Sequence, residues 1–235
     1  MELTIGVAKL GRFGKEESAE TVDVIERPSG GGFTIIMSDG LVNRVESKAV
    51  SFFVVNKISS LITEGVRDST AIRATSDQLF TNYGGTSQSL LNLISVDLVT
   101  DTIVISRNNP HPVYYYIRGD FHEWRNDSSP IGTAKHIQPS ITEIPIENGA
   151  IIIVASDGVF KAGHLYGQEI NLQMLVNAMV EDDNITDVQQ IADFIINQAL
   201  LLDQGQAQND MSVMILRISD DRQTLVRRSN YLFPI

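Results

Sequence analysis

The sequence predicts an α+β domain in which antiparallel β-sheets are covered by helices. Two observations lead to this prediction. Strand-like segments, marked by alternating or continuous apolar residues, occur in blocks instead of alternating one by one with helices. Stretches with helical spacing of apolar residues separate the blocks, and this order favours layered antiparallel sheets. Because no linker, repeat or low-complexity tract divides the chain, we expect a single domain over residues 1–235.

The first half of the chain is expected to hold six strands and one helical block. The glycine-rich segment 28–32 lies between the second and third predicted strands and lacks the Lys and Ser/Thr of a phosphate-binding loop. We therefore expect it to form a hairpin turn. The helical block runs from about 45 to 82 and has a break near 65–68. The six predicted strands cover 3–10, 20–27, 33–38, 88–98, 102–107 and 113–118.

The second half is expected to hold two amphipathic helices and four strands. Apolar residues at helical spacing mark one helix at Leu172, Leu175, Val176 and Met179, and another at Val188, Ile191, Ala192, Ile195, Ile196 and Ala199. A capping box formed by Thr186 and Gln189 is predicted to start the second helix. The four predicted strands cover 141–146, 150–155, 211–218 and 224–228.

Composition excludes several classes of function. The chain has 43% apolar and 20% charged residues, as globular proteins do, and no apolar run approaches the roughly 20 residues that span a bilayer. We therefore expect no membrane contact and a cytoplasmic location. The absence of cysteine excludes disulfides, thiolate metal sites and cysteine nucleophiles. A net charge of −11 argues against nucleic-acid binding, and the metal chemistry left open is that of Mg²⁺ or Mn²⁺ with oxygen ligands.

A repeated tripeptide is the most informative local feature. Ser38-Asp39-Gly40 and Ser156-Asp157-Gly158 each come directly after a continuous apolar run, which is typical of a strand covered on both faces. Each Asp is then expected at a sheet rim, held by rigid backbone, with a Gly that permits a sharp turn. Asp-Gly ends many strands without any function. Two copies in the same context shift the interpretation towards a functional site.

A third polar segment, Gln208-Asn209-Asp210, precedes the predicted strand 211–218. If this strand runs antiparallel to the two that end at Asp39 and Asp157, all three polar ends fall at one rim. Carboxylates gathered there would raise one another's pKa unless a cation balanced them. Two hard cations about 3.5–4 Å apart would activate water for in-line attack on phosphorus, with no protein nucleophile.

Six short motifs in the chain carry a family resemblance: Glu17-Ser18-Ala19-Glu20, Ser38-Asp39-Gly40-Leu41, Asn108-Asn109-Pro110-His111-Pro112, Pro130-Ile131-Gly132, Ser156-Asp157-Gly158 and Asn209-Asp210-Met211-Ser212. With these motifs the chain resembles the metal-dependent protein serine/threonine phosphatases, in the bacterial branch of the stage II sporulation protein E type. The resemblance covers nearly the whole chain. It implies two face-to-face antiparallel β-sheets flanked by helix pairs, an α-β-β-α sandwich.

The resemblance also implies a role for each site residue. Asp39 would bridge two Mn²⁺ or Mg²⁺ ions, with the Gly40 carbonyl on one of them. Asp157 and Asn209 would hold the other ion, and Glu20 would lie near the bridging position. The implied substrate is a protein carrying phosphoserine or phosphothreonine, in this branch commonly a regulator of a sigma factor.

Two departures from the family pattern bear on activity. Asn209 stands where the family has Asp, and Glu20 replaces an Asp and comes after Ala19 instead of Gly. Because ligand charge is a main determinant of affinity for hard cations, we expect at least one weakened metal site. Asp210 is expected to point to the opposite face of its strand and so not to compensate.

Alternatives to a protein phosphatase stay open. The lost charge at position 209 makes a weakly active or inactive phosphatase-like binding module a serious candidate. A phosphatase that acts on small phosphoesters is the third candidate function. His111, between two prolines, could lie on the substrate side and protonate a leaving serine oxygen, or pack as a turn residue against the sheet.

Overall fold

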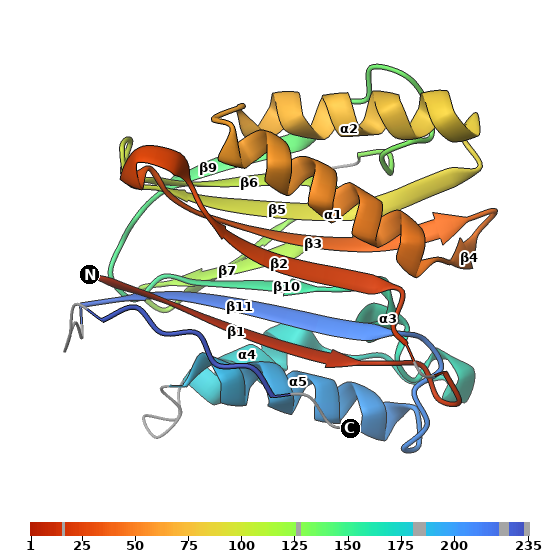
Figure 1. Cartoon of the computed structure of the whole chain (residues 1–235). Coiled ribbons are helices and arrows are strands. Elements are labelled where there is room, and N and C mark those ends of the chain that lie inside the picture. The colour runs from red at the N-terminus through yellow and green to blue at the C-terminus, as the bar shows by residue number, and fades with distance from the viewer. Residues whose placement is uncertain (16, 126–127, 181–186, 221–225, 233–235) are drawn as a thin grey trace.

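Two antiparallel β-sheets lie face to face in this protein, and a pair of helices covers the outer face of each (Figure 1). The structure is a computed structural model, which describes the chain except for residues 16, 126–127, 181–186, 221–225 and 233–235. The predicted α+β class and the α-β-β-α sandwich are confirmed. Among the described residues, none of the helices is long and apolar enough to cross a membrane.

The first sheet, sheet A, joins the two ends of the chain. Its strand order is β1-β11-β10-β7-β8, and every neighbouring pair is antiparallel. Helices α4 (Leu172–Val180) and α5 (Val188–Leu202) cover its outer face. The strands are β1 (Glu2–Leu10), β7 (Val113–Ile117), β8 (Asp120–Trp124), β10 (Ile151–Ala155) and β11 (Met211–Ser219).

The second sheet, sheet B, is built from the middle of the chain. Its order is β2-β3-β5-β6-β9, with the short β4 paired to β3. Helices α1 (Lys48–Thr63) and α2 (Asp68–Tyr83) cover its outer face. The strands are β2 (Glu20–Glu26), β3 (Gly32–Val42), β4 (Val45–Glu46), β5 (Ser87–Asp97), β6 (Thr102–Asn108) and β9 (Ser140–Pro145).

The continuous apolar runs of β3 and β10 result from burial on both faces. In β3, Ile35 points into the core between the sheets, while Ile36 points towards α1 and α2. In β10, Ile152 packs between the sheets and Ile153 packs beneath α4 and α5. Side chains of opposite parity thus enter different apolar layers, so neither strand needs a polar face.

The structure differs from the predicted elements in a few places. β3 continues to Val42 instead of ending at Ser38, because it pairs with β5 along its whole length and turns into β4. Strand β8, the helix α3 (Asp157–Lys161) and the 3-10 turns η1 (Pro28–Gly30) and η2 (His164–Tyr166) were not predicted. These elements are too short for a periodic pattern to reveal them.

The start of α5 and the C-terminal region also differ from expectation. Thr186 of the predicted capping box lies outside the described residues, and the N-cap is Asp187, whose side chain accepts from the Gln189 N–H. The Gln189 side chain instead binds the backbone of Val7 and so ties α5 to β1. The strand predicted at 224–228 lies partly outside the described residues, and 226–228 are not in a strand.

Candidate functional site

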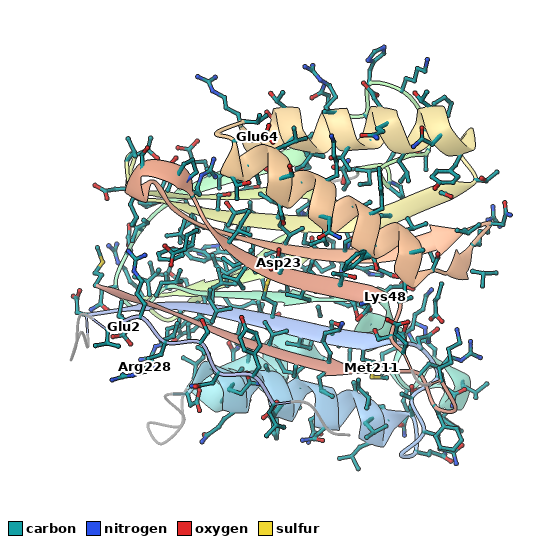
Figure 2. All side chains as sticks on the ribbon, in the orientation of Figure 1. Glu2, Asp23, Lys48, Glu64, Met211 and Arg228 are labelled. Atoms are coloured by element: carbon teal, nitrogen blue, oxygen red, sulfur yellow. The ribbon has the colours of Figure 1, made fainter. Side chains whose placement is uncertain are left out.

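A small cavity of about 100 Å³ lies between the two sheets at one end of the sandwich. That end is marked in Figure 2 by Lys48, at the start of α1, and Met211, at the start of β11. We call it the acidic cavity. Its lining residues are Glu20, Asp39, Leu41, Arg44, Glu46, Asp157, Gly158, Lys161, Asn209 and Asp210.

Four of the predicted ligands therefore line one cavity, but not at the rim of one sheet. Asp39 and Glu20 belong to sheet B and are direct partners in the β2–β3 ladder. Asp157 comes after β10 and Asn209 precedes β11, which are antiparallel neighbours in sheet A. The single rim that was expected is divided between the two sheets, because β3 lies in the opposite layer from β10 and β11. The polar ends instead meet across the gap between the layers.

Asp39 lies in the acidic cavity with little to balance its charge. Burial, and after it the nearby charges of Glu20 and Asp157, raises the pKa of Asp39 to about 8. No ion pair or hydrogen bond to the Asp39 side chain is present within the described part of the chain. A carboxylate in this position is an open ligand for a cation.

Glu20 extends from sheet B to sheet A. Its side chain is 1% exposed, and its Oε2 accepts a hydrogen bond from the hydroxyl of Ser212 on β11. Burial raises the pKa of Glu20 to about 7, although hydrogen bonds from Ser212 and Ser156 oppose the shift. Glu20 therefore links the two layers beside the cavity while keeping a high pKa.

Asp157 has the opposite surroundings. Its Oδ1 lies 2.6 Å from Nε2 of His111, and its Oδ2 forms an ion pair with the ammonium of Lys161, one helical turn further along α3. Burial acts to raise the pKa of Asp157, but the hydrogen bonds from His111 and Lys161 prevail and lower it below its usual value. Both carboxylate oxygens of Asp157 thus already have a partner.

His111 is held firmly in place beside Asp157. Its ring stacks on Phe160, with centroids 4.6 Å apart and planes at 7°. Its backbone N–H donates to Oδ1 of Asn109, and its carbonyl accepts from the buried guanidinium of Arg107. The structure therefore places His111 against Asp157, a residue that lines the acidic cavity, and Arg107 supports the turn that carries His111.

Asp210 has a structural task that the sequence did not reveal. Its carboxylate accepts the backbone N–H groups of Arg12, at 2.7 Å, and Ala19, at 2.6 Å. The residue also lines the acidic cavity. Asp210 precedes β11, and strand alternation does not apply to it.

The two glycines of the repeated tripeptide are required for close packing. A Cβ on Gly40 would lie 2.3 Å from the carbonyl oxygen of Ser47, and one on Gly158 would lie 1.9 Å from that of Asp210. The Gly40 carbonyl, the expected metal ligand, accepts the Ser47 N–H at 2.7 Å and keeps one lone pair. Each glycine thus brings a neighbouring segment close to its Asp.

Three further charged residues of the cavity were missed in the sequence. Glu46 on β4 pairs with Lys15 at 2.9 Å, and Arg44 occupies the β3–β4 turn with φ of 69°. Lys161 could have been found from its i,i+4 spacing to Asp157, had a helix been expected there. Arg44 also borders a second, open hollow of about 350 Å³ beside Gly84, Gly85 and Thr86.

The donor set of the acidic cavity suits a hard divalent cation. Asp39, Glu20, Asp157 and Asn209 offer only oxygen ligands, and burial raises the pKa values of Asp39 and Glu20. Among the residues that the structure describes, no three His, Cys, Asp or Glu side chains converge closely enough to hold an ion. Binding would therefore require Asp157 or Glu20 to exchange its present partner.

Comparisons with known proteins show the family of the chain. The family model described as "Stage II sporulation protein E (SpoIIE)" matches residues 29–219. Stage II sporulation protein E of Priestia megaterium is 22% identical over 91% of this chain and 36% of its own length, and that of Bacillus subtilis is 19% identical over 92% and 26%. The chain thus spans about a third of the length of the first relative and about a quarter of the length of the second.

Solved structures show the same fold. The PP2C phosphatase domain of SpoIIE from Bacillus subtilis, with a fragment of its regulatory domain, superposes with a TM-score of 0.77 at 18% identity, covering 93% of this chain and 63% of that one. The catalytic domain of the serine threonine protein phosphatase PstP, in complex with two manganese ions, gives 0.71 at 13% identity, covering 93% and 99%.

Proposed function

The chain belongs to the stage II sporulation protein E family, and on this premise we propose that it is a metal-dependent phosphatase acting on phosphoserine or phosphothreonine of a regulatory protein. The observation that carries the proposal is the meeting of Asp39, Glu20, Asp157 and Asn209 around one cavity between the sheets. The PP2C-type fold supports the reaction class, and PstP, with its two manganese ions, supports the choice of Mn²⁺. The family resemblance of the motifs favours a regulator of a sigma factor as the substrate.

Each residue has a defined part in the proposed reaction. Asp39 and Glu20 would hold one cation from sheet B, and Asp157 and Asn209 would hold a second from sheet A. When bound, Mn²⁺ or Mg²⁺ would activate water and neutralise charge on the phosphoryl group. Arg44 lies between the acidic cavity and the neighbouring hollow, where its guanidinium can orient the phosphoryl oxygens.

His111 is less suited to proton transfer than its residue type suggests. Its Nε2 is engaged with Asp157 and its ring is fixed against Phe160, so it is built to position a carboxylate. We assign it to the support of Asp157, in the way that a hydrogen-bonded neighbour orients a metal ligand.

A binding module is the second candidate, and one observation favours it. Both oxygens of Asp157 have protein partners, and Asn209 beside it carries no charge, so the sheet A side of the cavity is satisfied without a metal ion. A domain with this arrangement could recognise a phosphoprotein and turn it over slowly.

Turnover assays distinguish these functions. We expect Mn²⁺-dependent release of phosphate from a phosphoserine or phosphothreonine peptide, lost in Asp39→Asn and kept in the control Asp120→Asn, which changes an exposed residue of β8. Turnover of an aryl phosphate without the peptide would indicate a small-phosphoester phosphatase. Absence of turnover at millimolar Mn²⁺, with binding of the phosphopeptide, would support the binding module and reject the enzyme.

A further inference from the structure

Lys161 places a positive charge at the mouth of the acidic cavity. It is the last residue of α3, and its ammonium forms an ion pair with Oδ2 of Asp157 while its side chain lines the cavity together with Asp39, Glu20 and Asn209. The lysine side chain is 51% exposed and the Asp157 side chain 22% exposed. The ammonium therefore lies at the mouth of the cavity and its partner further inside.

The second oxygen of Asp157 is taken by a rigid group. Oδ1 lies 2.6 Å from Nε2 of His111, whose ring is stacked on Phe160 and whose turn is held by Asn109. His111 has little freedom to move away. A divalent ion that used Asp157 would have to displace Lys161, because the exposed lysine is the less constrained of the two partners.

The charges on the two sides of the cavity are unequal. On the sheet A side, the Asp157 carboxylate faces the Lys161 ammonium and Asn209 is neutral. The other carboxylate on this side, that of Asp210, is occupied by two backbone N–H groups. On the sheet B side, Asp39 and Glu20 are ladder partners, and Asp39 has no ion pair in the described part of the chain. Attraction for a divalent ion is therefore concentrated at Asp39.

We infer that the Lys161 ammonium is a built-in cation that takes the place of one divalent ion beside Asp157, so that the chain binds a single divalent ion, at Asp39. The inference rests on the proposed function, since it takes the cavity to be a cation site. An exposed ion pair by itself resists displacement weakly. The stronger effect is repulsion between the ammonium and a divalent ion on the same carboxylate, in a site partly shielded from water.

Calorimetric titration with Mn²⁺ tests the stoichiometry. We expect one ion per chain for the unaltered protein and two for Lys161→Met, or a second site strengthened at least about tenfold by the removal of the competing charge. Lys161→Arg retains the charge and should keep one ion. Lys135→Met removes the same charge from an exposed turn outside the cavity, and it should also match the unaltered protein.

The outcomes separate this inference from the proposed function. Two ions on the unaltered protein, with the same affinities as on Lys161→Met, would overturn the inference and leave the metal-dependent phosphatase intact. Failure of every variant to bind Mn²⁺ would overturn both. Unfolding temperatures measured without metal show whether Lys161→Met is folded, and Lys161→Gln is the substitute if it is not.

Chemical labelling gives a readout that does not depend on counting ions. An amine-reactive reagent, with detection by mass spectrometry, should modify Lys161 more slowly in the unaltered protein than in Asp157→Asn, which removes the charge of its partner. Lys135, on its exposed turn, should react equally in both and serves as the internal reference. Saturating Mn²⁺ should leave the protection of Lys161 in place, because the ion binds at Asp39. Loss of the protection on adding Mn²⁺ would show that the ion displaces the ammonium, and it would overturn the inference.

Discussion

The segments Ser38-Asp39-Gly40 and Ser156-Asp157-Gly158 have the same three residues and opposite electrostatic surroundings. Asp39 lies within the long strand β3 and faces Glu20, and its pKa is raised to about 8. Asp157 begins the short helix α3, where His111 and Lys161 lower its pKa. The same tripeptide thus gives a carboxyl without a counter-charge in one sheet and a neutralised carboxylate in the other.

The difference arises from the conformation of the chain just after each tripeptide. After Gly40 the strand continues into the β3–β4 turn, and Arg44 on that turn forms no ion pair with Asp39 that would lower its pKa. After Gly158 the chain forms a helical turn, which returns Lys161 to Asp157 at the i,i+4 position. The backbone conformation beyond the motif therefore decides whether each Asp is available to a metal ion.

The largest expected effect comes from exchanging each Asp for Asn. Asp39→Asn should abolish Mn²⁺ binding and lower kcat/KM on the order of 100-fold or more, because it removes the open ligand. Asp157→Asn should lower kcat/KM only roughly tenfold, because we expect Asp157 to contribute less to metal binding than Asp39 does. Phosphopeptide hydrolysis measures both. Equal losses in the two variants would contradict the asymmetry between the tripeptides.

Unfolding of the same variants shows whether the loss of activity is a loss of structure. Without metal, Asp39→Asn should raise the unfolding temperature, since it removes a buried carboxyl whose ionisation is unfavourable. Asp157→Asn should lower it, since it leaves His111 and Lys161 without their charged partner. A fall in both variants would argue against the pKa difference.

Glycine substitutions test the packing beside each Asp. Gly158→Ala should destabilise the protein by about 3 kcal/mol, because its Cβ would lie 1.9 Å from the backbone oxygen of Asp210. Gly40→Ala should cost a similar amount through contact with Ser47 and the start of α1. Urea unfolding measures both. Gly149→Ala is a control for a glycine with no atom near its Cβ, although its φ of 84° carries a smaller strain of its own.

A negative charge restored on the sheet A side of the acidic cavity should make its electrostatic surroundings more like those of the sheet B side. Asn209→Asp adds a carboxylate to the cavity, and we expect Mn²⁺ affinity to rise about tenfold because ligand charge governs binding of hard cations. Phosphopeptide turnover should rise with it. An unchanged affinity would show that position 209 does not contact the ion.

The pH dependence of stability should reflect Glu20 and Asp39, the two carboxyls on the sheet B side of the acidic cavity. The ordinary pKa values of 4.5 for Glu20 and 3.8 for Asp39 rise to about 7 and about 8 in the folded protein. Between the ordinary and the raised pKa values the folded state binds more protons than the unfolded state, so stability falls as pH rises. We expect the metal-free unfolding temperature to drop by roughly 5 °C from about pH 5 to about pH 8.

Two controls belong to this pH experiment. Asp39→Asn should flatten the profile, and saturating Mn²⁺ should do the same by supplying the missing counter-charge. The lowered pKa of Asp157 changes the stability only at pH values below about its ordinary pKa of 3.8. It therefore does not offset the fall in stability expected between about pH 5 and about pH 8. A metal-free unfolding temperature that rises from about pH 5 to about pH 8 would contradict the raised pKa values.

The smallest effect is expected at Arg44, the cation nearest in sequence to Asp39. Arg44→Ala should raise KM for the phosphopeptide about fivefold and leave kcat nearly unchanged, because an exposed guanidinium at the edge of the cavity contributes to binding. Steady-state kinetics with Arg73→Ala, which removes a charge from α2 instead, provides the control. A fall in kcat alone would place Arg44 in the reaction step.

Much of the fold could be predicted from sequence because its long elements have strong patterns. The apolar runs of β3 and β10 and the periodicity of α5 reflect burial that extends over many residues. Short elements such as α3 give no such signal, and α3 is the element that brings Lys161 to Asp157. The two Asp residues could be named from the repeated tripeptide. Their unequal surroundings could not, since they depend on contacts between distant segments, such as Glu20 with Ser212.

The pairing of β1 with β11 sets the time at which the acidic cavity can form. Their register joins Glu2 to Ser219 and Leu10 to Met211, and β1 lies at the edge of sheet A with β11 as its neighbour in the described chain. Ribosomal synthesis of the chain between Leu10 and Met211 takes roughly 10 to 40 s at typical rates. During that time the first strand remains without its partner, and the Ser212 contact of Glu20 is missing. A nascent chain therefore carries Asp39 and Glu20 long before it has a site, and assembly of the site is a late step of folding.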